Sequence, residues 1–404
     1  MQTGLDRLLR DADRLARLRG QRVALLANPA SMTGVDLGFA HGLDALVAKL
    51  GRAVSAAFGP QHGMRGDKQY NMEESPTFTD PKHGIPVFSL YGDHRRPTAD
   101  MLDHFDVLLC DLQDVGWRGY TWVATLLYML EACAGAGKAV WVLDRPNPAG
   151  RVVEGTRLVA GQESFVGVVP VPQRHGLTLG ELARYMVAHF ELDVALEVVP
   201  MGGYRPHEGP GFGWPADSVW VNPSPAIANL NCVRCYTGTV LLEGTRLSEG
   251  RGTTTPLEVF GAPDLPVEAL LAHMTATAAE FCGGCYLRPC FFEPFFNKYT
   301  RQLCAGVQIH ASFPGYDPNR FRPYRLISAM FKSLRAVQPD FELWHDFPYE
   351  YEPLTRHPID VINGGTSLRD WVDDPRAGIA DWDQALRIDE DAWAEERRPF
   401  LIYG

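Results

Sequence analysis

The feature that most constrains the fold is a series of short apolar segments in the first half of the chain, each followed directly by a polar loop. The segments span residues 22–27, 53–58, 85–90, 105–110 and 139–143. They are nearly continuous in apolar residues, as is typical of strands covered on both faces. Helical periodicity appears between several of them, at about residues 39–50, 97–104 and 121–135. This alternation predicts an α/β fold with a parallel, doubly wound sheet.

The sequence pattern changes after about residue 200. Residues 202–225 are rich in Gly, Pro and Trp and lack periodicity, which predicts a long loop or a domain junction. Beyond them, residues 240–242 and 306–310 predict strands, and residues 266–281 and 323–337 predict helices. We therefore expect a sheet domain over residues 1–228 and a smaller α+β domain over residues 229–404.

The charge balance excludes several classes of partner. Lys and Arg total 38 against 49 Asp and Glu, a net charge of −11. An acidic chain without a long basic block is a poor candidate for binding nucleic acid or an anionic membrane. No segment approaches the ~20 apolar residues of a membrane-spanning helix. Charged residues interrupt the N-terminal segment where a signal peptide needs an apolar core, so we expect a cytoplasmic location.

The cysteines include two C-x-x-C pairs, Cys232/Cys235 and Cys282/Cys285. Residues 236–281 separate the pairs, whereas a zinc ribbon usually places about 15–20 residues between them. Reduced structural thiols are therefore the favoured interpretation, with a metal site as the alternative.

Polar residues gather in the loops that follow the predicted strands. They are Asn28, His62, Asp111, Asp114, Asp144, Arg145 and Asn147. Because the carboxyl ends of parallel strands share one edge of the sheet, where ligands bind, these loops predict a site there. The alternative is that such residues only make turns and helix caps.

The familiar cofactor motifs are missing from the sequence. No G-x-G-x-x-G follows the first predicted strand, and Gly135-Ala136-Gly137-Lys138-Ala139 precedes a strand and lacks the Ser/Thr of a phosphate loop. There is no H-E-x-x-H and no G-x-S-x-G. We expect no cofactor and no metal, and a polar site for a hydroxyl-rich ligand.

Two further clusters are candidates for ligand binding. Residues 173–178, with Arg174 and His175, precede a predicted helix, and helix N-termini favour anions. The predicted cap of that helix is Thr178, with Glu181 completing a capping box. Residues 243–255 combine several charged side chains with glycines, as functional loops do. The alternative for this second cluster is an exposed hairpin whose ion pairs contribute little.

Several of these stretches resemble one known family. They are residues 58–63, 89–92, 111–121, 143–148, 153–155, 174–182, 223–225, 243–254, 295–298 and 348–350. Together they resemble the exo-β-N-acetylmuramidase (NamZ) family, glycoside hydrolase family 171, over nearly the whole chain. The resemblance implies a Rossmann-like N-terminal domain and a smaller C-terminal domain with the active site in the cleft between them. It also implies removal of β-1,4-linked N-acetylmuramic acid from the non-reducing ends of peptidoglycan fragments.

The sequence departs from this family at Gln61, where many members have a glutamate favoured as a catalytic residue. A glutamine amide cannot exchange a proton as a carboxyl does. We therefore expect the general acid to be Glu74, buried beside Met72, with Glu73 as second choice. Asp114 is the candidate base or electrostatic partner, and His62 the candidate for orienting the acid or relaying a proton.

The remaining candidates are assigned to substrate binding. Arg118 and Tyr120 are expected to hold the sugar, and Arg145, ahead of Arg174 and Arg251, to pair with the lactyl carboxylate. The other expected substrate-binding residues are Asn28, Asp144, Asn147, His175 and Glu249. The alternative is that Asp111 and Asp144 brace loops or cap helices, with Arg145 ion-paired to one of them.

Three functions remain open from the sequence. The first is a cytoplasmic exo-acting glycosidase for an amidosugar or muropeptide, in cell-wall turnover. The second is a muropeptide-binding protein without catalysis, which Gln61 favours. The third is a Rossmann-like enzyme that uses a nucleotide sugar.

Overall fold

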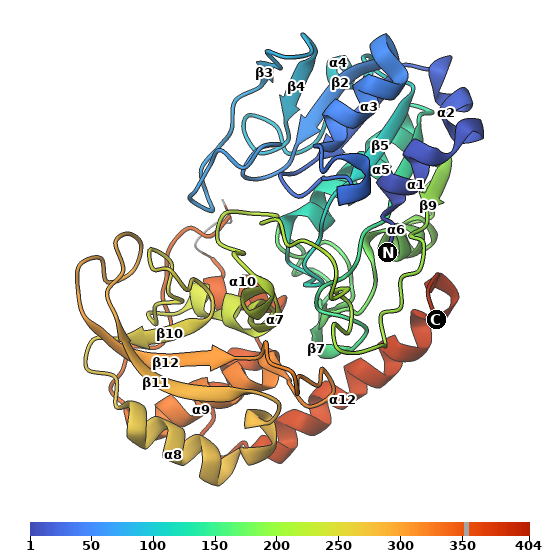
Figure 1. Ribbon diagram of the computed structural model, residues 1–404. Helices are drawn as coiled ribbons and strands as arrows, with labels where there is room; N and C mark the ends of the chain where they lie inside the picture. Colours follow the sequence, from blue (N-terminus) through green and yellow to red (C-terminus); the bar gives the residue numbers. More distant parts are fainter. Residues whose placement is uncertain (351–354) are drawn as a thin grey trace.

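A seven-stranded sheet forms the centre of the first half of the chain (Figure 1). The computed structural model describes residues 1–350 and 355–404. In spatial order the strands are β3 (Phe78–Thr79), β4 (Pro86–Ser89), β2 (Val54–Gly59), β1 (Val23–Ala27), β5 (Val107–Asp111), β6 (Ala139–Leu143) and β9 (Leu196–Val199). All neighbours pair in parallel except β3, which is antiparallel to β4. The five strands predicted from apolar segments are thus confirmed.

The order of the parallel strands is that of a Rossmann-like sheet. Counted along the chain, the six parallel strands lie in the order 3-2-1-4-5-6, and the direction of winding reverses between β1 and β5. Ligands in such sheets bind beyond the carboxyl ends of the strands, near this reversal.

Helices cover both faces of the sheet, which explains the continuous apolar strands. The side chains of Val23 and Leu25 pack with one group of helices, and those of Ala24 and Leu26 with the other. The first group is α1 (Gly4–Arg10), α2 (Ala12–Arg19) and α3 (Gly42–Leu50), with the short helices η1 (Val35–Leu37) and η2 (Gly51–Ala53) nearby. The second group is α4 (Ala99–Leu102), α5 (Thr121–Gly135) and α6 (Leu179–His189). The capping box predicted for Thr178 and Glu181 begins α6.

The second half of the chain is a smaller α+β unit. Its antiparallel sheet has the order β10 (Val259–Ala262), β12 (Cys304–His310) and β11 (Tyr286–Phe292). Its helices are α7 (Leu230–Thr239), η3 (Val240–Gly244), α8 (Val267–Thr277), η4 (Ala279–Cys282), α9 (Pro323–Val337), α10 (Pro358–Asn363), α11 (Ser367–Asp373), α12 (Ile379–Glu396) and η5 (Arg398–Phe400). The predicted fold class is confirmed. The domain boundary at residue 228 stays a prediction.

One predicted strand is wrong. Residues 240–242 form the start of the 3-10 helix η3, which continues directly from α7. A short apolar run does not distinguish a buried strand from a buried helical segment. The long loop expected over residues 202–225 is confirmed, because residues 200–229, which are all described, contain no helix or strand between β9 and α7.

The last part of the chain, from α12 to the C-terminus, packs back against the first half. A two-stranded sheet, β7 (Glu154–Arg157) and β8 (Pro172–Arg174), packs against α12 (Figure 1). Beyond α12, the hydroxyl of Tyr403 donates to Asp144 Oδ2 over 2.7 Å, at the carboxyl end of β6. The C-terminus is thereby anchored to the N-terminal sheet.

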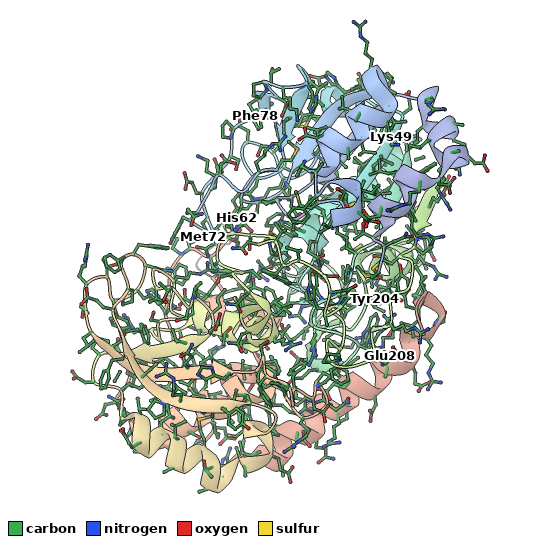
Figure 2. All side chains as sticks on the ribbon, in the orientation of Figure 1. Lys49, His62, Met72, Phe78, Tyr204 and Glu208 are labelled. Atoms are coloured by element: carbon green, nitrogen blue, oxygen red, sulfur yellow. The ribbon has the colours of Figure 1, made fainter. Side chains whose placement is uncertain are left out.

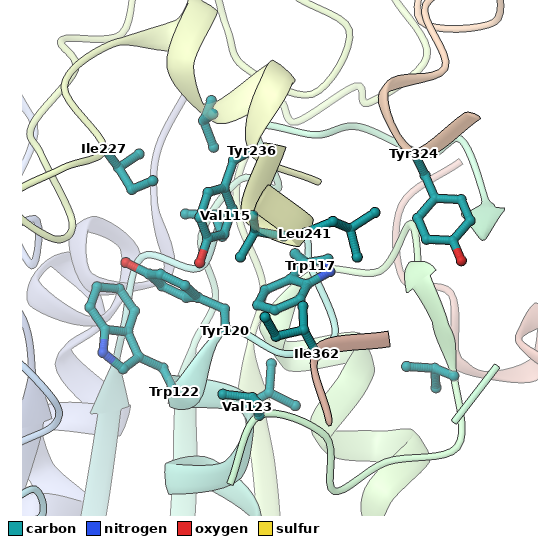
Figure 3. Packing of buried hydrophobic residues seen from close by; sticks show 14 of the residues in the cluster. Val115, Trp117, Tyr120, Trp122, Val123, Ile227, Tyr236, Leu241, Tyr324 and Ile362 are labelled. Atoms are coloured by element: carbon teal, nitrogen blue, oxygen red, sulfur yellow. The ribbon is translucent and has the colours of Figure 1, made fainter. Parts of the chain in front are cut away.

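An aromatic cluster continues the core from one half into the other. Figure 3 shows Trp117 and Tyr120, from the loop after β5, packed with Tyr236 of α7. Trp117 and Tyr236 meet edge to face with ring centroids 5.5 Å apart, and Tyr120 and Tyr236 do so at 6.0 Å. This packing fixes the loop after β5 against the C-terminal half.

Across residues 1–350 and 355–404, we find no helix whose length and apolar character would let it span a membrane.

Tyr324 supports Asn363, the residue of the C-terminal half that accepts hydrogen bonds from the first half. Its hydroxyl donates to Asn363 Oδ1 over 2.6 Å, and Asn363 also accepts hydrogen bonds from Arg118 and Gln173 through its backbone oxygen. Tyr324→Phe leaves a buried acceptor less well satisfied, so we expect a loss of about 1–2 kcal/mol in the free energy of unfolding. Urea unfolding measures it. The exposed Tyr286→Phe should be neutral, and equal effects would contradict this account.

Candidate active site

A narrow pocket lined by polar and aromatic side chains lies where the two halves meet. It is lined by Gln61, His62, Asn71, Trp117, Gly119, Tyr120, Thr121 and Val166 from the first half, and by Ser224, Ala226, Ile227, Tyr236, Glu243, Arg251, Tyr349 and Glu350. All of the first group except Val166 follow β2 or β5, near the reversal in strand order. The pocket therefore occupies the edge of the sheet at which ligands are expected.

The loop after β2 brings two predicted residues into this pocket. Gln61 and His62 follow the last residue of β2, Gly59, and are both buried. His62 has φ 70°, a left-handed conformation that is unfavourable for a residue with a Cβ and is often found at functional sites. Figure 2 shows His62 with Met72 on the side of the N-terminal half that faces the C-terminal half.

His62 is a neutral side chain in this setting. Its Nδ1 lies 2.8 Å from the backbone oxygen of Lys68, so Nδ1 carries the hydrogen. Burial lowers the pKa of His62 to about 4, and the positive charge of Arg251 acts in the same direction. His62 is therefore suited to orienting neighbours rather than to supplying a proton near neutral pH.

The acidic group of the pocket is Glu350, whose side chain is only 5% exposed. Its Oε2 accepts a hydrogen bond of 2.7 Å from the hydroxyl of Tyr91, and its Oε1 one of 3.2 Å from Gln61 Nε2. Burial raises the pKa of Glu350 to about 7, because these two hydrogen bonds to neutral groups only partly offset the loss of hydration. Its φ of 48° is also left-handed.

Gln61 is held as a hydrogen-bond donor to this carboxyl. Its Oε1 accepts 2.7 Å from Thr121 Oγ1, and its Nε2 also donates to the backbone oxygen of Asn71. Both ends of the amide thus have partners that fix which end faces Glu350. Gln61, which does not titrate, thus positions the carboxyl of Glu350, which does.

A second carboxylate, Glu243, lies in the same pocket in a different environment. Its Oε1 is 2.5 Å from Arg251 Nη2, and its Oε2 accepts 2.7 Å from the hydroxyl of Tyr349. Behind this pair, Glu249 contacts Arg251 at 3.4 Å and Lys298 Nζ at 2.9 Å. Burial opposes ionisation of Glu249, but these two cations hold its pKa below the ordinary value.

The two carboxyl groups of the pocket, Glu350 and Glu243, lie in different environments. Glu350 has neutral donors and keeps its proton to about pH 7, whereas Glu243 is paired with a guanidinium. Two carboxyls whose surroundings differ in this way fit one proton donor and one anionic partner. Within the described part of the chain, no three His, Cys, Asp or Glu side chains are grouped to hold a metal ion.

Four of the residues predicted from sequence line this pocket. They are Gln61, His62, Tyr120 and Arg251. Glu73 and Glu74 have exposed side chains, and Glu73 pairs with Lys68 at 3.2 Å. The expected burial of Glu74 is therefore wrong.

Asp114 and His175 lie deeper, under the loop after β5. His175 Nε2 is 3.8 Å from Asp114 Oδ2, and both residues are almost fully buried. Burial raises the pKa of Asp114 to about 7 and lowers that of His175 to about 3. Asp114 Oδ2 accepts 2.7 Å from the backbone N–H of Gly116, so this carboxyl braces the loop that carries Trp117 and Tyr120.

Two more predicted binding residues, Arg145 and Asp144, make hydrogen bonds within the protein. Arg145 donates to both oxygens of Asp111, over 2.7 and 2.9 Å, and borders a separate pocket with Met32 and Trp214. Asp144 accepts from Thr178 Oγ1 and from the backbone N–H of Gly180 at the start of α6. Both follow the bracing alternative drawn from the sequence.

Arg118, Asn28, Asn147 and Arg174 also satisfy backbone groups. Arg118 donates to four carbonyl oxygens and Arg174 to that of Ala149. Asn28 and Asn147 each accept from the backbone N–H two residues further on, and donate to carbonyls of other loops. The two asparagines thus form turns, and the two arginines hold separate backbone segments together.

The sequence did not predict Glu350 as a site residue, and it indicated Glu243 only as part of the charged cluster at residues 243–255. Both lie in stretches that carry the family resemblance, residues 348–350 and 243–254. That resemblance was the one available signal, because the hydrogen-bond partners of Glu350 lie 259 and 289 residues away in sequence.

Comparison with known proteins agrees with this two-part architecture. The family model "Exo-beta-N-acetylmuramidase NamZ, N-terminal" matches residues 23–231, and the corresponding C-terminal model matches residues 234–403. The chain is 34% identical over 408 residues to peptidoglycan beta-N-acetylmuramidase NamZ of Bacillus subtilis (strain 168), covering 100% of this chain and 91% of that protein.

Two crystal structures from Bacteroides fragilis NCTC 9343 share the fold. Both are DUF1343 family proteins. One has a TM-score of 0.82 at 27% identity, covering 100% of this chain and 99% of that one. The other has a TM-score of 0.74 at 25% identity, covering 100% and 98%.

The fold and the pocket together define a class of protein in which an α+β half closes over a Rossmann-like half and two carboxyls lie in the pocket between them. Both family models together cover nearly the whole chain. The chain belongs to the exo-β-N-acetylmuramidase NamZ family.

The raised pKa of Glu350 makes a prediction about stability. Folded Glu350 keeps its proton to about pH 7, whereas the unfolded chain releases it near 4.5, so the native protein loses stability as the pH rises across this interval. Glutamine does not titrate. The Tm of Glu350→Gln relative to wild type should therefore increase between about pH 5 and about pH 8.

Thermal unfolding at both pH values measures this difference. Glu74→Gln is the matched control, because it removes an exposed carboxyl, and should change the Tm little at either pH. A Glu350→Gln difference that is the same at both pH values would contradict the proposed proton on Glu350.

Proposed function

We propose that this chain is an exo-acting glycosidase that removes β-1,4-linked N-acetylmuramic acid from the non-reducing ends of peptidoglycan fragments, in cell-wall turnover. The observation that carries the proposal is the buried Glu350, which holds a proton up to about pH 7 in a pocket that also contains the ion-paired Glu243. Family membership supports the sugar, since the Bacillus subtilis relative is named a peptidoglycan beta-N-acetylmuramidase.

Glu350 takes the role of general acid. Glycoside cleavage needs a proton on the leaving oxygen as the bond to the sugar breaks. Tyr91 and Gln61 fix the Glu350 carboxyl from two sides, which limits the directions in which it delivers its proton. A pKa near the working pH is the value at which a carboxyl is both protonated and a good donor.

Glu243 supplies the negative charge. The transition state resembles an oxocarbenium ion, and a carboxylate beside it is stabilising. Arg251 and Tyr349 hold Glu243 in place by its two oxygens. Of the three arginines considered for the lactyl carboxylate, Arg251 lines this pocket, and we propose it for that contact.

The pocket must widen to admit a sugar. Its volume of about 40 Å³ is close to the space that one ordered water requires, and far below that of a pyranose ring. We propose that the wall of the pocket that carries Asn71 moves outward as substrate enters, while Gln61 and Tyr91 keep their hydrogen bonds to Glu350.

The cytoplasmic location is part of the proposal. All eight cysteines are free thiols, as is usual in a reducing compartment. Cell fractionation with an antibody to the chain tests it, and recovery outside the cytoplasm would contradict it.

Hydrolysis of a chromogenic N-acetylmuramic acid β-glycoside tests the proposed activity, with the N-acetylglucosamine analogue as control substrate. Wild type should hydrolyse the first in preference to the second, with a rate that falls as the pH rises through about 7, because Glu350 then loses its proton. Glu350→Gln should lower kcat about 10²–10⁴-fold and remove that dependence. Glu74→Gln should retain activity.

Other outcomes separate the competing functions. Loss of activity in Glu74→Gln but not in Glu350→Gln would return the acid role to the loop after β2. Binding of a muramyl sugar by calorimetry without turnover would establish a binding protein. Tight binding of a uridine nucleotide would favour the nucleotide-sugar enzyme.

Gln61 gives a separate prediction. In Gln61→Glu a second carboxyl replaces the amide that lies 3.2 Å from Glu350, and two carboxyls at this distance share one proton. The shared proton is lost at higher pH, so the basic limb of the pH–kcat profile should move upward. Gln302→Glu adds the same charge at an exposed position and should leave the limb in place. An unshifted limb in Gln61→Glu would refute the contact.

A further inference from the structure

A second, larger pocket adjoins the candidate active site. It has a volume of about 490 Å³ and shares two lining residues, Ala226 and Arg251, with the narrow pocket. Its other lining residues include Gln69, Thr253, Thr254, Glu293, Phe295 and Phe296. This volume lies in the range of small-molecule sites, so a single sugar unit can be accommodated.

Two phenylalanines of this pocket are exposed although they are large and apolar. Phe295 is 63% and Phe296 45% exposed. Water-exposed aromatic side chains that line a pocket are typical of ligand contacts rather than of a core. The guanidinium of Arg301 lies 4.2 Å from the centre of the Phe295 ring and helps to orient it.

Gly252 fixes this aromatic pair directly beside the candidate active site. The backbone N–H of Phe295 donates to Gly252 O over 2.9 Å. A Cβ on Gly252 would lie 2.5 Å from the backbone oxygen of Phe296, and Gly252 has φ +83°, so glycine is required on both counts. Because Gly252 follows Arg251, the backbone of Phe295 and Phe296 is held next to the Arg251–Glu243 ion pair.

The lining has the chemistry of a pyranose site. The C–H groups on one face of a pyranose ring fit against an aromatic face, whose negative potential attracts them. Around the rings lie Gln69, Thr253 and Thr254, which offer hydrogen bonds to hydroxyl and acetamido groups. Arg251, which this pocket shares with the narrow one, is proposed there for the lactyl carboxylate. The carboxylate of Glu293 then disfavours a second anionic sugar, so the neutral N-acetylhexosamine is the better occupant.

We propose that this pocket binds the sugar on the leaving side of the scissile bond, a neutral N-acetylhexosamine, with Phe295 and Phe296 as its stacking surface. This inference rests on the proposed function, because it assigns the neighbouring unit of the same substrate. It adds to that function a preference for a glycan over a simple glycoside.

The test compares two substrates that differ only on the leaving side. One is the disaccharide in which N-acetylmuramic acid is β-1,4-linked to N-acetylglucosamine, and the other is the methyl β-glycoside of N-acetylmuramic acid. Phe295→Ala and Phe296→Ala should each lower kcat/KM for the disaccharide about tenfold and leave that for the methyl glycoside nearly unchanged. Phe295→Tyr keeps a ring and should restore the preference.

Phe291→Ala is the matched control, since Phe291 is 73% exposed on β11 and does not line the pocket. If wild type cleaves the substrates but both variants lower the two kcat/KM values equally, or neither, the leaving-side assignment is overturned. If wild type cleaves neither substrate, the proposed function itself fails. Circular dichroism melts of the exposed-site variants check that each is folded.

Discussion

The buried guanidinium of Arg118 is the constraint on which the relation between the two halves depends. It donates to the carbonyls of Thr156 and Val171 at 3.0 and 3.3 Å, and to those of Ile362 and Asn363 at 3.4 and 2.7 Å. Two acceptors thus come from each half. Burial lowers the pKa of Arg118 to about 10, yet the group stays charged near neutral pH. A buried charge needs all these hydrogen bonds, so separation of the halves along this seam is unfavourable.

The fixed seam determines the chemistry of the pocket, because each half supplies only part of it. Glu350 and Glu243 belong to the C-terminal half, whereas Gln61 and Tyr91, which donate to Glu350, belong to the loops after β2 and β4. The raised pKa of Glu350 results from burial between the halves. The acid is therefore a property of the closed arrangement, because the C-terminal half alone would leave Glu350 without Gln61 and Tyr91 and exposed to water.

The sequence predicted the sheet more completely than the site, for a physical reason. Strands buried on both faces are recognisable from a few consecutive apolar residues, and the capping box at Thr178 requires residues only three positions apart. By contrast, Arg145 and Asp144 do lie at the expected edge of the sheet, but they turn inward to Asp111 and to the start of α6. Residue types at an edge do not reveal in which direction their side chains point. The partners of Glu350, Gln61 and Tyr91, lie 289 and 259 residues earlier in the chain, and no local pattern connects them.

The substitution at Gln61 is understandable in terms of these contacts. A glutamate there would place a second buried carboxyl about 3.2 Å from that of Glu350, and the two carboxyls would share one proton. The amide avoids this coupling, because Nε2 donates to Glu350 while Oε1 is held by Thr121. Glu350 then keeps its own proton, and the charge of Glu243 remains paired with Arg251. Proton donation and negative charge are thus assigned to different carboxyls by their neighbours, and the loss of a carboxyl at position 61 is consistent with a working acid rather than with a lost one.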